Sequence, residues 1–119
     1  MNPFRFILYV VVAFAALFVL RRILLLVRGG IRVDEMNELK AKGALIVDVR
    51  TSGEFAQASA PGSLNIPLDQ LPQRMGELTK AKPIILCCAS GSRSAYAQRF
   101  LKQAGYVEVY NAGPWQRVL

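Results

Sequence analysis

The sequence predicts an α/β fold of three layers around a central, mainly parallel sheet, preceded by one N-terminal transmembrane helix. Residues 6–20 form a long apolar stretch without any charge. Residues 44–49 and 83–87 are short, continuous apolar runs, as in buried parallel strands. Residues 94–104 carry apolar side chains at helical spacing. Strands joined by helices imply right-handed crossovers and a parallel sheet with helices on both faces.

The apolar segment at the N-terminus is short for a membrane span on its own. Fifteen helical residues rise about 22 Å, whereas the hydrocarbon core is roughly 30 Å thick. The aliphatic residues 23–27 supply the remaining length if Arg21 and Arg22 reach toward the headgroups. We therefore expect residues 4–27 to contact the membrane in a single pass. The chain then divides into an anchor with a hinge, residues 1–30, and one domain, residues 31–119.

Three other interpretations of this segment fit less well. A cleaved signal peptide would end in small residues before a cleavage site, but here the run continues into Arg21, Arg22 and further aliphatic residues. A buried core helix would place both arginines inside the protein. A helix lying on the membrane surface would show a polar face, which residues 6–20 lack.

The basic charge is concentrated beside the apolar segment. The formal net charge is +7, and residues 1–32 hold five arginines and no acidic residue. Most of these arginines follow the apolar segment, so the positive-inside rule places the domain in the cytoplasm. Two free cysteines suit that reducing compartment. The bases are not interleaved with aromatic residues, so nucleic acid is not an expected partner.

The first elements of the domain follow directly. Gly29 and Gly30 are expected to end the helix and form a hinge, and residues 31–33 show the alternation of a short strand. Asp34 is placed to cap the next helix. The charges of that helix suit its macrodipole, with acids early, lysines late and a glycine just past its end: Glu35, Glu38, Lys40, Lys42 and Gly43.

The remaining elements alternate along the chain. A stretch rich in Gly and Pro, residues 51–72, is expected to hold short helical pieces and loops between the two buried strands. The helix over 94–104 ends at Gly105, and residues 107–110 alternate as a last strand. Trp115 is expected to pack against the sheet edge.

Cys88 and the residues after it form the candidate site. A buried strand runs into Cys88 and a helix follows at once, and ligands in such folds sit at the C-terminal ends of strands. A thiol there faces successive backbone N–H groups and a helix N-terminus, which lower its pKa and favour the thiolate. We therefore expect Cys88 to be the catalytic nucleophile. The substrate-binding loop would be Ala89, Ser90, Gly91, Ser92 and Arg93.

The composition excludes other kinds of chemistry. The chain contains no His, so imidazole serves neither as a base nor as a metal ligand. One adjacent cysteine pair is far short of a zinc ligand set. Two neighbouring cysteines also cannot close a loop of the chain with a disulfide. We therefore expect no metal and no cofactor.

Residues near the loop have expected structural roles. Cys87 should face away from the loop cysteine, because side chains alternate along a strand, and should be buried. Asp48 and Arg50 are expected to belong to the scaffold. Arg93 is equally suited to holding an anion and to pairing with Asp48 or Glu54.

Several motifs together resemble the rhodanese-like domains. They occur in that family's order and spacing across residues 31–119: Leu45-Ile46-Val47-Asp48-Val49-Arg50, Glu54-Phe55, Pro61-Gly62-Ser63-Leu64-Asn65-Ile66-Pro67, Cys88-x-x-Gly91-x-Arg93-Ser94 and Gly105-Tyr106. The resemblance implies the family's α/β fold and a sulfurtransferase, in which Cys88 accepts a sulfane sulfur as a persulfide and passes it to a thiol or another nucleophile. The loop would hold the persulfide and the donor's anionic group.

The partners implied by this resemblance are a small sulfur donor, thiosulfate or a persulfide, and a thiol or protein acceptor. Thiosulfate-using members often carry basic residues inside the loop, whereas here only Arg93 is basic. The sequence therefore gives less support to thiosulfate as the natural donor.

Two other functions stay open at this point. Counted from Cys87, the same segment reads Cys-x5-Arg and ends at Arg93, which is the loop length of cysteine phosphatases and related arsenate reductases. Counted from Cys88, the loop is one residue shorter and suits a single sulfur. The other alternative is a membrane-tethered binding module that recognises a partner through the loop without turnover.

Overall fold

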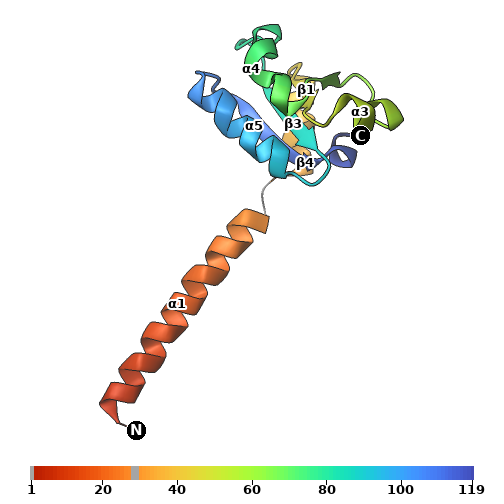
Figure 1. Cartoon of the computed structure of the whole chain (residues 1–119). Helices are drawn as coiled ribbons and strands as arrows, with labels where there is room; N and C mark the ends of the chain where they lie inside the picture. The colour runs from red at the N-terminus through yellow and green to blue at the C-terminus, as the bar shows by residue number, and fades with distance from the viewer. Residues whose placement is uncertain (1, 28–29) are drawn as a thin grey trace.

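The computed structural model of the chain describes residues 2–27 and 30–119. A long N-terminal helix precedes an α/β domain, and the two are drawn together in Figure 1. The helices are α1 (Pro3–Val27), α2 (Val33–Ala41), α3 (Ser52–Gln57), α4 (Leu71–Arg74) and α5 (Ser92–Gln103). The strands are β1 (Leu45–Asp48), β2 (Leu64–Asn65), β3 (Ile84–Cys88) and β4 (Val109–Pro114), with short 3-10 turns η1 (Leu68–Gln70), η2 (Met75–Glu77) and η3 (Trp115–Val118).

The four strands form one parallel sheet in the order β2-β1-β3-β4. The chain leaves β1 toward β2 on one side and resumes with β3 on the other. The strand order therefore reverses between β1 and β3, and this switch point is where ligands bind in open parallel sheets. The pairing of β3 with β4 shifts register between Leu86 and Cys87, because Leu86 pairs with Asn111 and Cys87 with Gly113. Ala112 is the extra residue of a bulge.

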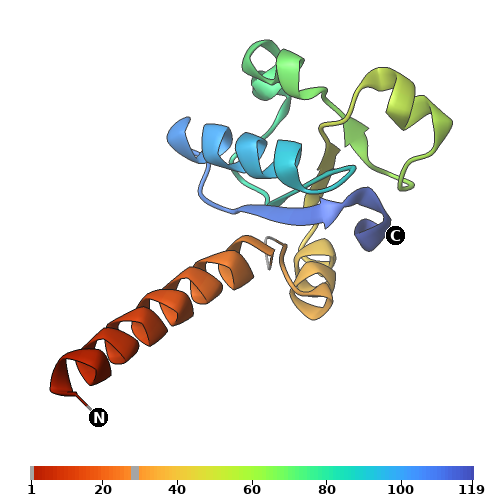
Figure 2. The ribbon, with the colours of Figure 1, turned by 60° about the horizontal axis from the view of Figure 1, so that its bottom comes forward.

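Two hydrophobic cores lie on opposite faces of the sheet, which gives the predicted three layers. Figure 2 shows β4 running between α5 and α2. The face under α5 holds the larger core: Val47, Val49, Ile66, Leu71, Leu78, Ile84, Leu86, Cys88, Ala97, Leu101, Tyr106 and Val109. The face under α2 and η3 holds the smaller core: Met36, Leu39, Ala60, Ile85, Cys87, Ala112 and Val118.

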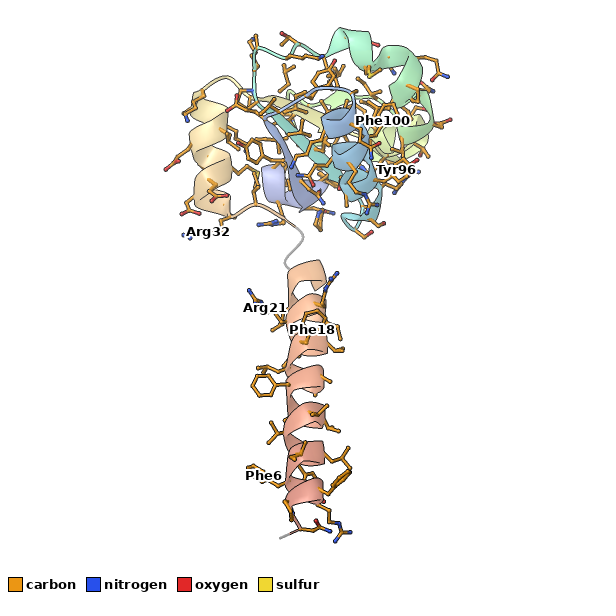
Figure 3. The ribbon with its side chains drawn as sticks, turned by 90° about the vertical axis from the view of Figure 1, so that its left-hand side faces the viewer. Phe6, Phe18, Arg21, Arg32, Tyr96 and Phe100 are labelled. Atoms are coloured by element: carbon orange, nitrogen blue, oxygen red, sulfur yellow. The ribbon has the colours of Figure 1, made fainter. Side chains whose placement is uncertain are left out.

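Helix α1 is a candidate membrane span. The stretch Pro3–Leu24 has a mean hydropathy of 2.3, and none of it is buried inside the protein. Figure 3 shows Phe6, Phe18 and Arg21 extending outward from this helix. Arg22 stacks over the ring of Phe18 at 5.6 Å, so the arginine lies along the apolar surface of the helix instead of interrupting it. Arg28 and Gly29, which the sequence analysis assigns to the basic flank and the hinge, lie outside the described residues.

The entry into the domain differs from the prediction. Residues 31–33 form no strand, and α2 begins at Val33 with Arg32 at its N-cap position. The Asp34 carboxylate binds the Arg32 guanidinium at 2.8 Å instead of capping the helix. Two alternating apolar residues are too few to tell a strand from a helix start. The N–H of Ile31 still donates to the β4 carbonyl of Asn111 at 2.8 Å.

The last strand and the helix before it also differ at their ends. Strand β4 begins at Val109, whereas Val107 is exposed and outside the strand. Helix α5 begins two residues earlier than predicted, at Ser92. Val107 alternates with its neighbours in the sequence but does not join the sheet. The pairing of β4 with β3 begins at Val109, which lies opposite Ile84, the first residue of β3.

Arg117 links the start of the domain to its last strand through hydrogen bonds. Its guanidinium donates to the carbonyl of Ala112 at 2.6 Å and to the carbonyl of Ile31 at 2.7 Å. Gly30 lies against the same place, and a Cβ there would lie 2.9 Å from the Ala112 carbonyl oxygen. A glycine is therefore needed for this close approach.

A buried ion pair holds the end of β1. Asp48 is fully buried and its carboxylate accepts from Arg50 Nε and Nη2 at 2.8 to 3.0 Å. Arg50 also donates to the carbonyl of Ala58 at 2.7 Å, and its guanidinium stacks over the ring of Trp115 at 4.9 Å. These contacts agree with the scaffold role expected for Asp48 and Arg50 and with the packing role expected for Trp115.

Candidate active site

Cys88 lies where the sequence analysis expects it, at the C-terminal end of a central strand. It is the last residue of β3, and α5 begins only four residues later at Ser92. The preceding strand β1 ends beside it, so the site lies at the switch point of the sheet. The loop takes its shape from Gly91, which adopts a φ of 104° and forms the N-cap of α5. A side chain there would be strained.

The sulfur of Cys88 forms hydrogen bonds with the loop and with the start of α5. The backbone N–H of Gly91 donates to Sγ at 2.9 Å. The Ser94 hydroxyl lies 3.3 Å from Sγ. Cys88 and Ser94 are both fully buried, so these hydrogen bonds form where water competes little.

These contacts favour the thiolate form. Burial raises the pKa of Cys88, but hydrogen bonds from the Ser94 hydroxyl and from the backbone N–H groups of Ser94, Gly91 and Ser90 outweigh it, and the net pKa lies below the ordinary value of a thiol. A thiolate is the nucleophilic form of cysteine.

Cys87 differs from its neighbour in each of these respects. Its side chain lies in the core under α2, on the face opposite Cys88, as strand alternation predicts. Burial, together with the nearby Asp48 carboxylate, raises the pKa of Cys87 to about 12. A Cys-x5-Arg phosphate loop needs its thiol inside the loop and ionised. The structure therefore does not fit the phosphatase and arsenate reductase alternative built on Cys87.

Arg93 pairs with Glu54 and not with Asp48. The guanidinium donates to both carboxylate oxygens of Glu54 at 2.7 and 3.0 Å. Glu54 also completes a capping box with Thr51 at the start of α3. The hydrogen bond from Arg93, followed by that from the Thr51 backbone, lowers the pKa of Glu54 to about 2. The pair thus joins the loop after β3 to the segment after β1.

The other predicted loop residues have small, exposed side chains. Ala89, Ser90 and Ser92 are exposed, and the hydroxyls of Ser90 and Ser92 lie 3.2 Å from each other. Of these three residues, Ser90 directs its backbone N–H at the Cys88 sulfur. Within residues 2–27 and 30–119, no three His, Cys, Asp or Glu residues come together as a metal site.

Two polar residues that the sequence did not mark as functional, Ser94 and Asn111, complete the site. Ser94 Oγ lies 2.7 Å from Asn111 Oδ1, and both residues are buried. In the sequence, Asn111 is a polar residue directly after the strand predicted over residues 107–110, whereas the structure places it inside β4. That pattern alone does not indicate which loop the side chain faces.

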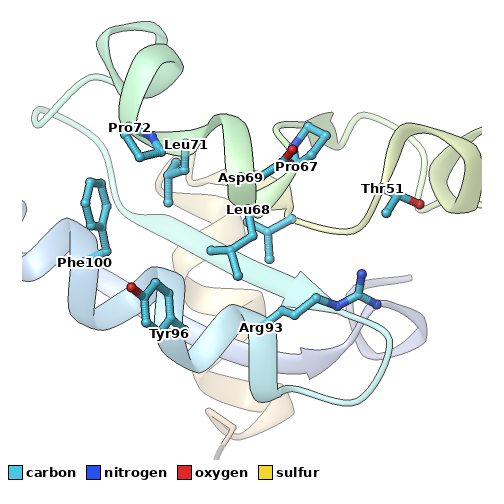
Figure 4. A pocket seen from close by; sticks show the side chains of 10 residues that line it. Thr51, Pro67, Leu68, Asp69, Leu71, Pro72, Arg93, Tyr96 and Phe100 are labelled. Atoms are coloured by element: carbon cyan, nitrogen blue, oxygen red, sulfur yellow. The ribbon is translucent and has the colours of Figure 1, made fainter.

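A groove of about 430 Å³ adjoins the site. Figure 4 shows it between α5 and the segment around Leu68 and Pro72, with Arg93 near one end and Phe100 near the other. Its lining is mostly apolar. Tyr96, on α5, is an exposed member of this lining.

Alkylation across pH provides a direct test of the two thiol environments. In the full chain, the rate at which iodoacetamide modifies Cys88 is expected to rise with pH through a midpoint below that of an ordinary thiol, because only the thiolate reacts. Cys87 should stay unmodified near neutral pH, since its pKa is about 12 and it is buried. Peptide mass spectrometry separates the two sites. A Cys88 midpoint at or above the ordinary value contradicts the prediction.

Comparisons with known proteins agree with this geometry. Residues 32–113 match the rhodanese-like domain family. A sulfurtransferase of Allochromatium vinosum is 42% identical over 67 residues, which cover 56% of this chain and 63% of that protein. The thiosulfate sulfurtransferase PspE of Escherichia coli is 32% identical over 69 residues, covering 56% and 66% of the two chains.

Solved structures show the same fold. A rhodanese-related protein from Thermoplasma volcanium superposes with a TM-score of 0.65 at 30% identity, over 75% of this chain and 88% of that one. The chain spans 63% of the A. vinosum relative, and 54% and 39% of two Bacillus subtilis relatives. The parallel sheet, the cysteine at the end of its central strand and these matches together show that the chain belongs to the family of rhodanese-like domains.

Proposed function

We propose that the protein is a membrane-anchored sulfurtransferase that carries sulfane sulfur on Cys88. The observation that supports this most is the sulfur environment, in which the Gly91 N–H lies 2.9 Å from Sγ and the Ser94 hydroxyl 3.3 Å from it. These donors stabilise a thiolate, and after loading the same loop would surround the anionic outer sulfur of a persulfide. Relatives named sulfurtransferase support the reaction class.

The proposed reaction has two displacement steps. The Cys88 thiolate attacks the sulfane sulfur of the donor, the donor's S–S bond breaks, and sulfite leaves if the donor is thiosulfate, or a thiolate if it is a persulfide. An acceptor thiolate then attacks the outer sulfur of the Cys88 persulfide, which regenerates the Cys88 thiolate and leaves a persulfide on the acceptor. Each step breaks one S–S bond and forms another, so no external oxidant or reductant is consumed.

The small loop side chains have a role in access. Cys88 is fully buried, so a donor reaches its sulfur only when loop atoms move aside. The loop residues Ala89, Ser90 and Ser92 are small and exposed, and they present little bulk to displace. The extra sulfur of a persulfide would occupy the space that opens.

Intact mass spectrometry of the full chain in detergent tests this function. After exposure to thiosulfate or, separately, to a low-molecular-weight persulfide, we expect a gain of one sulfur atom that cyanide removes. The donor that loads the protein faster identifies its substrate class. If neither donor loads the protein, the sulfurtransferase proposal fails and the binding-module alternative takes its place.

Glu54 is expected to compete with an anionic donor for Arg93. In Glu54→Gln the capping box can persist, because Gln also serves at that position, but the charged partner of Arg93 is lost. Since exposed ion pairs contribute at most about 1 kcal/mol, the KM for thiosulfate should fall by up to about fivefold with little change in kcat. Steady-state kinetics measures this.

Glu77→Gln is the matched control for this variant. It breaks the exposed Arg74–Glu77 pair, which lies outside the loop, and should leave KM unchanged. An unchanged or higher KM in Glu54→Gln would show that Arg93 does not bind the donor.

We further propose that residues 1–30 anchor the domain, residues 31–119, on the cytoplasmic side of a membrane. Helix α1 provides the apolar length over Pro3–Leu24, and the arginines that follow it set the orientation. The full chain is expected to stay with membranes after carbonate washing, which releases peripheral proteins. Protease added to the cytoplasmic side should digest the domain. Release by carbonate, or protection from that protease, would overturn the anchor or its orientation.

A further inference from the structure

Asn111 lies on β4, outside the loop, but its side chain contacts the loop at two places. Its residue is 5% exposed. Its amide nitrogen donates to the carbonyl of Gly91 at 3.2 Å, and its amide oxygen lies 2.7 Å from Ser94 Oγ. Both contacted residues supply the hydrogen bonds to Cys88 Sγ.

The bulge in β4 fixes which way the Asn111 amide points. The backbone N–H of Gly113, two residues on, donates to Asn111 Oδ1 at 2.9 Å. A backbone N–H only donates, and the Gly91 carbonyl only accepts, so the oxygen must face Gly113 and the nitrogen must face Gly91. The extra residue Ala112 directs the Gly113 N–H toward Asn111. The orientation is therefore set by the chemistry of the neighbouring groups.

Ser94 has one proton and three acceptors within reach. Its hydroxyl lies 2.7 Å from Asn111 Oδ1, 3.1 Å from the Gly91 carbonyl and 3.3 Å from Cys88 Sγ. The Gly91 carbonyl already accepts from the Ala95 N–H at 3.0 Å and from the Asn111 amide. With that carbonyl occupied, the Ser94 proton is shared between Asn111 and the sulfur.

We propose that Asn111 is a positioning residue that holds the Ser94 hydroxyl beside the Cys88 sulfur. When Cys88 is a thiol, it donates to Ser94 Oγ, and Ser94 donates to Asn111. When Cys88 is a thiolate, the Ser94 proton turns to the sulfur. In both states Asn111 Oδ1 accepts from the Gly113 N–H, so it keeps a partner when the Ser94 proton turns away. The catalytic consequence rests on the proposed function of Cys88.

Removing the amide should draw Ser94 away from the sulfur. In Asn111→Leu, which is close in volume, the Gly91 carbonyl regains a free lone pair. A serine hydroxyl in the first turn of a helix readily bonds such a nearby carbonyl, and the thiolate then loses one of its donors. The midpoint of Cys88 alkylation by iodoacetamide is expected to rise by about one pH unit, which is a tenfold loss of thiolate below the midpoint.

The experiment is a double-variant cycle in the full chain. Asn111→Leu and Ser94→Ala should each raise the midpoint, and the double variant should shift it no further than Ser94→Ala alone, because Asn111 acts through Ser94. Gln98→Leu is the matched control, since its amide also joins α5 to β4, at the Val109 carbonyl, without contacting the loop. It should leave the midpoint unchanged.

The outcomes separate this inference from the proposed function. An unchanged midpoint in Asn111→Leu, or additive shifts in the cycle, overturns the positioning role. Asn111→Ala, assayed in the same way, gives the answer if the leucine variant does not fold. Sulfur uptake is measured separately by intact mass. If the wild-type chain takes up no sulfur but the midpoints shift as expected, the sulfurtransferase proposal fails and the positioning role stands.

Discussion

Replacing Cys88 with serine is expected to abolish sulfur uptake, with a loss on the order of 10³-fold or more. A hydroxyl at this position keeps the size of the side chain and can still accept from the Gly91 N–H. It does not ionise near neutral pH, however, and offers no sulfur for a persulfide. Intact mass after exposure to donor, together with steady-state turnover, measures the loss.

Cys87→Ser is the matched control, one residue away. Its side chain lies in the core under α2, so sulfur uptake should persist at near wild-type levels. Placing a hydroxyl in that core should lower the free energy of unfolding by about 1–3 kcal/mol. Uptake that survives in Cys88→Ser and disappears in Cys87→Ser would reverse the assignment of the two cysteines.

Arg50→Met is expected to destabilise the domain more than any surface change. It leaves the Asp48 carboxylate fully buried without its guanidinium partner. Breaking a buried pair from one side costs about 3–5 kcal/mol in the free energy of unfolding, a large part of the stability of a small domain. The variant should unfold at a much lower urea concentration. The fluorescence of Trp115, the single tryptophan of the chain, reports the transition.

Arg32→Met provides the comparison for an exposed pair. Arg32 and Asp34 form an ion pair of similar length, 2.8 Å, but their side chains are 78% and 63% exposed. The free energy of unfolding should change by no more than about 1 kcal/mol. If Arg50→Met behaves like Arg32→Met, Asp48 is not held by charge in the folded domain.

The sequence predicted those parts of the site that depend on local pattern. A continuous apolar run ending at Cys88, followed at once by small residues and a helix, was enough to place the cysteine at the end of a strand. Period-two alternation was enough to separate Cys87 from Cys88. The helix over residues 94–104 was also predictable, apart from its start, because the helix begins at Ser92 with Gly91 at its N-cap position.

The parts that could not be predicted depend on contacts between distant segments. Arg93 meets Glu54 across 39 positions of sequence, and the local pattern did not distinguish this carboxylate from Asp48. Asn111 meets Gly91 and Ser94, 20 and 17 positions earlier in the sequence, only because β4 pairs with β3 in the sheet. Residues 31–33 alternate like a strand, but Arg117, close to the other end of the chain, decides how Ile31 is held.

The hydrogen bond from Arg117 to the carbonyl of Ile31 fixes the point where the folded domain begins. This point determines how far the domain can move from the membrane. Helix α1 ends at Val27, and four residue steps of at most about 3.6 Å each separate it from Ile31. With α1 in the membrane as proposed, the domain therefore samples only a thin layer beside the bilayer. Such confinement raises the effective concentration of a partner held in the same layer above its value in free solution. Sulfur exchange with that partner could then run on an affinity too weak to detect between the two proteins free in solution.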